Sequence, residues 1–91
     1  MANWPNKDPD DELDYVVDWS QWLGEDTIVS AAWSISPSGE LALERQSETD
    51  DMATVWLSGG VAGEAYEVTC QITTAAGRLR SQTTKLKVKD L

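Results

Sequence analysis

The side chains of this chain that could do chemistry are clustered carboxylates and a single thiol. Asp8, Asp10, Asp11 and Glu12 offer the hard oxygen ligands that calcium prefers. The stretch lacks the alternate-ligand spacing and the central glycine of an EF-hand loop. We therefore expect a solvated acidic segment, with calcium binding as the alternative, and we assign no metal ligand.

Catalysis has no other support in the sequence. The chain has no histidine, and Cys70 is its only cysteine, so a transition-metal site or an activated nucleophile lacks partners. A pair of carboxylates for glycoside hydrolysis would need a cleft between them, whereas the acidic cluster lies on an exposed segment. The glycine-rich residues 59–63 lack the Lys-Ser/Thr sequel of a phosphate-binding loop and indicate a turn. We expect no enzyme activity, no catalytic residue and no cofactor.

The charge of the chain is acidic and unevenly distributed. Sixteen acidic and seven basic residues give a net charge of −9, which argues against nucleic acid and anionic membrane as partners. Residues 1–26 hold eight acids and one lysine, whereas residues 78–91 hold five basic residues and one acid. Two interpretations stay open: an acidic first strand lies near a basic last strand, or identical or related subunits associate head to tail.

The compartment can also be inferred from the sequence. A single cysteine permits no internal disulfide, so a disulfide-stapled secreted module is not expected. The polar, acidic residues 1–15 lack the apolar region of a signal peptide, and no apolar run approaches the ~20 residues of a membrane span. We expect synthesis in a cytoplasm, which is compatible with later assembly into an extracellular particle.

The elements that must position these residues are strands. Apolar and polar side chains alternate through residues 66–73, which is typical of a strand with one buried and one solvated face. The apolar face of this strand carries Tyr66, Val68, Cys70 and Ile72. Residues 54–58 alternate in the same way, and the glycine-rich turn separates the two runs. A tyrosine at the start of a late strand, soon after a glycine, suits a tyrosine corner.

The first half of the chain also predicts strands. Residues 13–19 alternate, although Asp8 as N-cap and Pro9 at the first helical position make a helix the competing interpretation. Residues 20–24 indicate a turn, or one loose helical turn ended by glycine. Residues 26–35 predict the second strand, with Trp33 as the core tryptophan.

The remaining segments complete an all-β pattern. Leu41 and Leu43 mark a short strand, and residues 45–52 fit a long loop or a ragged edge strand. Residues 79–89 predict the last strand. Leu79 and Leu86 would lie on opposite faces of a regular strand, so we expect a β-bulge or bend near residues 81–83. This pattern predicts an immunoglobulin-like antiparallel β-sandwich, or a related small barrel. Residues 1–12 would be an extended acidic N-terminal arm, and residues 13–91 the sandwich.

Two surfaces are candidates for partner contact. An extended arm can add to the sheet edge of another subunit, which makes Trp4, Pro5, Asp8, Asp10 and Asp11 candidate contact residues. Trp56 falls on the face opposite its apolar neighbours in residues 54–58. It is either covered by a neighbouring loop or a contact hot spot.

Several segments resemble a family of small proteins of tailed bacteriophages and prophages. The resemblance is carried by Trp4-Pro5-x-Lys7-Asp8-Pro9, Leu13-Asp14-Tyr15-x-x-Asp18-Trp19-Ser20, Gly24-x-Asp26-Thr27-Ile28, Thr54-Val55-Trp56-Leu57-Ser58-Gly59-Gly60 and Ile72-Thr73-Thr74-Ala75-Ala76-Gly77-Arg78. Members are described as fibre–tail adaptors or as phage structural proteins. The resemblance implies an immunoglobulin-like domain that works as one of the repeated copies in a symmetric particle.

These observations together predict a non-enzymatic virion structural protein that acts as a tail or fibre adaptor through protein–protein contacts. Its partners would be other virion structural proteins, with a homo-oligomer or ring possible in the particle. It would be made in the host bacterial cytoplasm and located in the virion. The alternatives are a stand-alone immunoglobulin- or fibronectin-like module that recognises a glycan or surface protein, and a capsid decoration protein.

Overall fold

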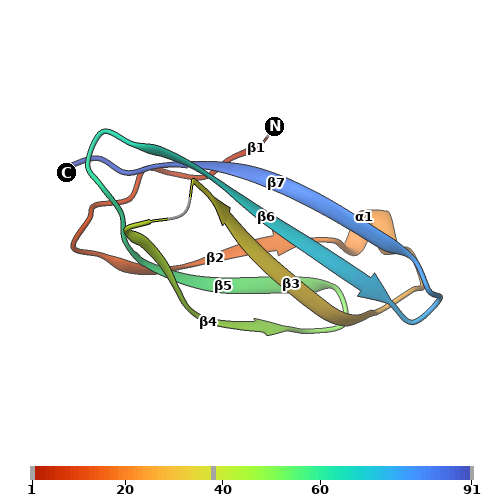
Figure 1. Ribbon diagram of the computed structural model, residues 1–91. Coiled ribbons are helices and arrows are strands. Elements are labelled where there is room, and N and C mark those ends of the chain that lie inside the picture. Colours follow the sequence, from red (N-terminus) through yellow and green to blue (C-terminus); the bar gives the residue numbers. More distant parts are fainter. Residues whose placement is uncertain (1, 38, 91) are drawn as a thin grey trace.

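Two β-sheets face each other in the computed structural model, which describes residues 2–37 and 39–90 (Figure 1). Positions 1, 38 and 91 of the predicted arm and sandwich lie outside the described residues. One sheet has the order β1-β7-β6-β3, built from Ala2–Asn3, Leu79–Lys87, Ala65–Thr74 and Ile28–Ser36. The other has the order β2-β5-β4, built from Glu12–Asp18, Met52–Gly59 and Leu41–Glu48. A short helix, α1 (Ser20–Leu23), follows β2.

The prediction of an all-β antiparallel sandwich is confirmed. Every strand pair is antiparallel except β1 with β7, which is parallel. The strand order corresponds to an immunoglobulin constant-type sandwich whose first strand has joined the other sheet. The backbone N–H of Val61 donates to the Tyr66 hydroxyl at 3.0 Å, as expected for a tyrosine at this corner of the chain.

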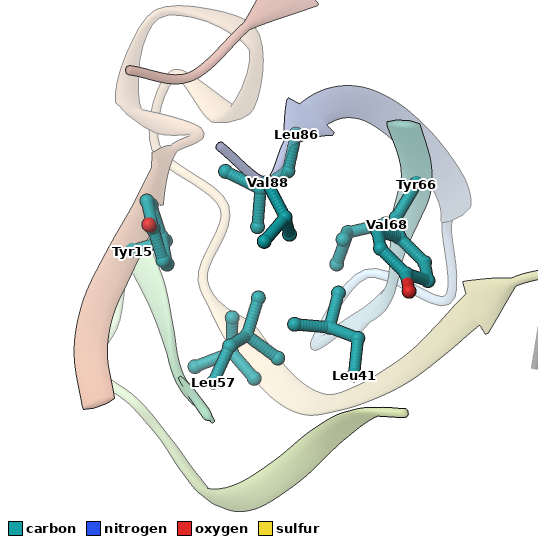
Figure 2. Close-up of a cluster of buried hydrophobic side chains, with 8 residues drawn as sticks. Tyr15, Leu41, Leu57, Tyr66, Val68, Leu86 and Val88 are labelled. Carbon is teal, nitrogen blue, oxygen red and sulfur yellow. The ribbon is translucent and has the colours of Figure 1, made fainter. Parts of the chain in front are cut away.

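The core lies between the inner faces of the two sheets. On β5, Ala53, Val55 and Leu57 are fully buried, and on β6 so are Cys70 and Ile72. Figure 2 shows one cluster, in which Leu41 and Leu57 from one sheet face Tyr66, Val68, Leu86 and Val88 from the other side. Each fully buried Leu or Val contributes roughly 1.5–3 kcal/mol relative to exposure, so this alternation is the main source of stability.

The prediction that Trp33 is the core tryptophan holds only in part, because Trp33 packs against both core clusters without being fully buried. Trp19 is the buried one, with 3% of its surface exposed, whereas Trp33 is half-buried. Trp19 directly precedes α1, and the helical turn covers its ring at the end of the sandwich, where it packs in a cluster with Cys70 and Ile72. Trp33 lies on the edge strand β3, so neighbours cover it on fewer sides.

The predicted bulge at residues 81–83 is also absent. The β6–β7 register runs without a shift from Ala65↔Lys87 to Thr73↔Leu79. Leu79 and the buried Leu86 lie on opposite faces of β7, and Leu79 points outward with 63% of its surface exposed. The register shifts fall instead on the edge strands β3 and β4, where no second neighbour opposes the extra residue.

The open alternatives of the first half are also resolved. Residues 12–18 form strand β2, so the helical interpretation of this segment is wrong. The loose helical turn is confirmed as α1, which ends at Gly24 with a φ of 62°. Strand β4 continues to Glu48, so the polar segment after Leu43 is mostly an edge strand rather than a loop.

We expect the turn after β5 to be the most glycine-dependent part of the fold. A Cβ on Gly59 would lie 2.5 Å from the backbone oxygen of Glu40, and Gly59 has a φ of 73°. Gly63 has a φ of 91° with nothing within 4 Å, so it supplies the matched control. Gly59→Ala should lower the free energy of unfolding by about 3 kcal/mol, and Gly63→Ala by about 1 kcal/mol. Urea titration measures both, and equal losses would contradict the backbone clash.

Candidate interaction surfaces

The N-terminal segment is fixed to the sandwich by a buried lysine. Lys7 has no exposed surface, and its Nζ donates to the backbone oxygens of Gly59, at 2.7 Å, and Asp8, at 2.9 Å. Its backbone N–H donates to the Lys87 oxygen at 3.0 Å, and its own oxygen accepts from Lys89 at 2.8 Å. Lys7 therefore joins the first residues to the end of β7 and to the turn after β5.

Burial changes the ionisation of this region. Desolvation lowers the pKa of Lys7 from its ordinary value, and the carboxylates of Asp11, Asp8 and Asp10 oppose that shift. Burial also raises the pKa of Tyr15 to about 12, and the charges of Asp11 and Asp14 act in the same direction. Tyr15 thus keeps its proton at neutral pH beside a cluster of carboxylates.

The predicted contact residues of this segment divide between core and surface. The Trp4 ring is half-buried and stacks on Tyr15, with ring centroids 4.6 Å apart. Pro5, Asp10 and Asp11 are exposed, and Asp8 is half-buried. The Asp8 side chain and backbone accept from the N–H groups of Asp10 and Asp11, so residues 8–11 form a turn at the tip of the molecule. The acidic side chains are accessible there, whereas much of Trp4 serves the fold.

Trp56 lies apart from that segment, on the outer face of the β2-β5-β4 sheet. It is half-buried, and the guanidinium of Arg45 lies 4.1 Å from its ring centroid. Arg45 is the cross-strand partner of Trp56 because the register shift between Leu43 and Arg45 brings this side chain to the outer face. A cation over an indole face is worth about 0.5–1 kcal/mol at such a site. Trp56 is therefore covered by a neighbouring strand rather than by a loop.

Apolar and acidic side chains surround this pair. Val16 and Met52 are 44% and 40% exposed, and both point outward from the same sheet. The other outward side chains of β2 are Glu12, Asp14 and Asp18. Tryptophan and arginine are the residue types most enriched in binding hot spots. The outer face of β2-β5-β4 thus combines an aromatic–arginine pair, exposed apolar side chains and an acidic edge.

The segregated charges lie on opposite outer faces. The acids of β2 belong to one sheet, whereas Lys85 and Lys87 point outward from β7 in the other. Within residues 2–37 and 39–90, the ion pair that forms joins Arg78 to Asp26 at 3.0 Å. This pair joins the acidic residues 1–26 to the basic residues 78–91, so the intramolecular interpretation is supported at this place. Among the described residues, no ion pair joins the acids of β2 to the lysines of β7.

Sequence reasoning missed the polar corner around Asp26. The Arg78 side chain donates to Asp26 and, at 3.0 Å, to the Leu23 backbone oxygen, and it lies over the Trp22 ring at 4.3 Å. Hydrogen bonds from the Thr74 hydroxyl, from backbone N–H groups and from Arg78 lower the pKa of Asp26 to about 2, against a smaller effect of burial. The signal was available, since two of the motifs that carry the family resemblance meet here.

The fold also places the acidic residues that could bind a metal ion and the thiol of Cys70. Across residues 2–37 and 39–90, no cluster of acidic, cysteine or histidine side chains is arranged to hold a metal ion. Cys70 is fully buried, and burial raises the pKa of its thiol to about 11. No helix in this part of the chain is long and apolar enough to cross a membrane.

The fold and its surfaces define a small all-β structural domain whose accessible features are suited to protein contact. The chain belongs to the family described as podophage GP4 fiber-tail adaptor protein gp77, whose model matches residues 7–87. The match begins and ends at two residues, Lys7 and Lys87, whose backbones are hydrogen-bonded to each other. No curated protein matches the chain. Family membership confirms the predicted resemblance and places the chain among phage tail structural proteins.

We expect the Lys7 side chain to be needed for stability rather than for solubility. Lys7→Met keeps most of the aliphatic stem but leaves the Gly59 and Asp8 oxygens without this donor, so the free energy of unfolding should fall by roughly 1–3 kcal/mol. Lys89→Met is the matched control, because Lys89 is exposed and takes part through its backbone. Urea titration should show a change within about 0.5 kcal/mol for this control. Equal effects of the two changes would contradict the role of Lys7.

The Asp26 corner should make the stability depend on acid pH. Its pKa is about 2 in the folded state and near 3.8 in the unfolded chain, so its contribution is present above about pH 4 and is lost as the pH falls through 2. Asp26→Asn should therefore destabilise the protein at pH 6, and the difference from wild type should shrink at pH 2.5. Urea titrations at both pH values test this, with exposed Asp50→Asn as the control. A pH-independent difference would contradict the ionic role.

Proposed function

We propose that this chain is a non-enzymatic virion component that joins tail and fibre proteins by direct protein–protein contact. Membership in the fiber-tail adaptor family supports a structural role in the tail. The finer proposal is that the protein is made in the host bacterial cytoplasm and then assembles with other virion structural proteins. Copies of the chain in a homo-oligomer or ring are part of this proposal.

The observation that carries the proposal is the Trp56–Arg45 pair. Its ring and guanidinium are stacked at 4.1 Å, so both side chains are pre-ordered and lose less conformational freedom when a partner covers them. Exposed Val16 and Met52 on the same face extend the apolar contact area. A partner of matching shape would cover the aromatic and apolar side chains at the centre of the interface.

The acids around this surface suggest the character of the partner. Glu12, Asp14 and Asp18 line the free edge of β2, and the exposed Asp10 and Asp11 continue the negative charge to the tip. Charges at an interface rim chiefly accelerate association and select orientation. We propose that the partner surface is basic and that the association rate falls as salt is added.

Substitutions on the exposed surface are better tests than truncation. Trp4 stacks in the core and Lys7 is buried, so a deletion of residues 1–12 would also change folding. Trp56→Ala should weaken binding to the tail or fibre partner of the same phage at least tenfold, since a hot-spot residue contributes about 2 kcal/mol or more. Arg45→Lys should also weaken binding, because a lysine keeps the charge but not the planar stack.

Biolayer interferometry against the purified tail and fibre proteins measures these affinities. Val61→Ala is the matched control, because Val61 is 43% exposed and lies in the turn after β5, away from the Trp56–Arg45 pair. It should bind like the wild type. Unchanged binding of folded Trp56→Ala, or turnover of a substrate by the pure protein, would refute the proposal.

A further inference from the structure

The outer face of β3, β6 and β7 differs from the rest of this acidic molecule. Three successive rows of outward side chains, from Ser30-Thr73-Leu79 through Ala32-Gln71-Ser81 to Ser34-Thr69-Thr83, contain no charged residue. Charge returns in the next row, where Glu67 and Lys85 are cross-strand partners and offset each other. The chain carries a net charge of −9, so this neutral patch is a distinct surface.

The neutral patch has both protruding and hollow parts. Val29 and Leu79 lie at one end and are 61% and 63% exposed, the highest exposures among the large hydrophobic side chains of the described residues. Small residues farther along leave a shallow hollow of about 260 Å³, lined by Ala32, Trp33, Ser34, Thr69, Gln71 and Ser81. The patch thus offers apolar projections and a recess on one face.

One pair of polar groups on the patch is already satisfied within the sheet. The hydroxyls of Thr69 and Thr83 are hydrogen-bonded to each other at 2.9 Å, so part of their hydrogen-bonding capacity is satisfied within the sheet. Serine and alanine side chains of the hollow are short and have little rotamer entropy to lose. Burial of such a surface therefore requires no charge to be desolvated.

We propose that two copies of this chain associate face to face through the neutral patch, about a two-fold axis. Each copy carries the same net charge, so copies repel each other unless the touching surfaces are neutral. The outer face of the opposite sheet carries Glu12, Asp14 and Asp18 along β2, so a contact between two copies through that strand would bring like charges into one interface. A two-fold contact brings the same patch together from both copies, which lets the projections of one lie toward the hollow of the other.

The size of the patch sets the expected strength of the dimer. The molecule measures 41 × 23 × 20 Å, so one whole broad face could bury at most on the order of 800 Å² per copy, the standard size of a specific interface, and the neutral patch covers only part of such a face. We expect a dissociation constant in the micromolar range. The dimer would leave the Trp56–Arg45 surface of both copies open and so add bivalent contact. The inference rests on the homo-oligomer part of the proposed function, but not on the contact that the Trp56–Arg45 surface makes with tail or fibre proteins.

Sedimentation velocity of the full chain from 1 to 500 µM tests the dimer. Ser81→Glu places an unpaired charge on the patch, which dimerisation would have to bury, and should weaken dimerisation at least tenfold. Ser47→Glu is the matched control, because Ser47 is also an exposed strand serine but lies on the opposite sheet. It should dimerise like the wild type. Circular dichroism shows that each variant is folded, and amide shifts on dilution should map to β3, β6 and β7.

Three outcomes would overturn the inference. The wild type could stay monomeric at 500 µM, or folded Ser81→Glu could dimerise as well as the wild type. Association that disappears in 0.5 M salt and is unaffected by Ser81→Glu would indicate head-to-tail contact between acidic β2 and the lysines of β7 instead. None of these results depends on the affinity of Trp56 variants for tail proteins, so the two proposals can fail separately.

Discussion

The burial of two apolar inner faces against each other is the constraint on which the rest of the structure depends. The alternating side chains of β5 and β6 leave Val55, Leu57, Cys70 and Ile72 with no exposed surface. Because side chains alternate along a strand, this burial also fixes which residues point outward. The Trp56 surface and the neutral patch are therefore the outer faces of the two sheets whose inner faces form the core. A shift of one residue in the register of a strand would turn its core side chains toward solvent.

Two polar tethers close the ends of this sandwich. At one end Lys7 reaches the turn after β5, and at the other Arg78 joins the β6–β7 turn to Asp26 and the carbonyl of α1. Each tether joins segments that are more than 50 residues apart in sequence. The motifs that carry the family resemblance contain these residues, so they have a structural explanation that requires no catalytic role.

The two outer faces differ in the way expected of a protein held between others. One face carries an aromatic–arginine pair among acids, which suits a different, basic partner, and the other is neutral across three rows of side chains. The acidic edge strand β2 also resists unplanned strand pairing. A small domain with two chemically different faces can contact a partner through one face and a second copy through the other, as the two proposals require.

The sequence by itself determined the all-β class, the buried face of residues 66–73, the turn ended by Gly24 and the outward direction of Trp56, because each depends on local periodicity or on a nearby glycine. Only the tertiary structure decided that Lys7 is buried, that Trp19 is more deeply buried than Trp33, and that Arg45 covers Trp56. These features depend on contacts between distant segments and on a register shift at an edge strand. Side-chain alternation along one strand carries no information about either, since it does not specify which strands become neighbours.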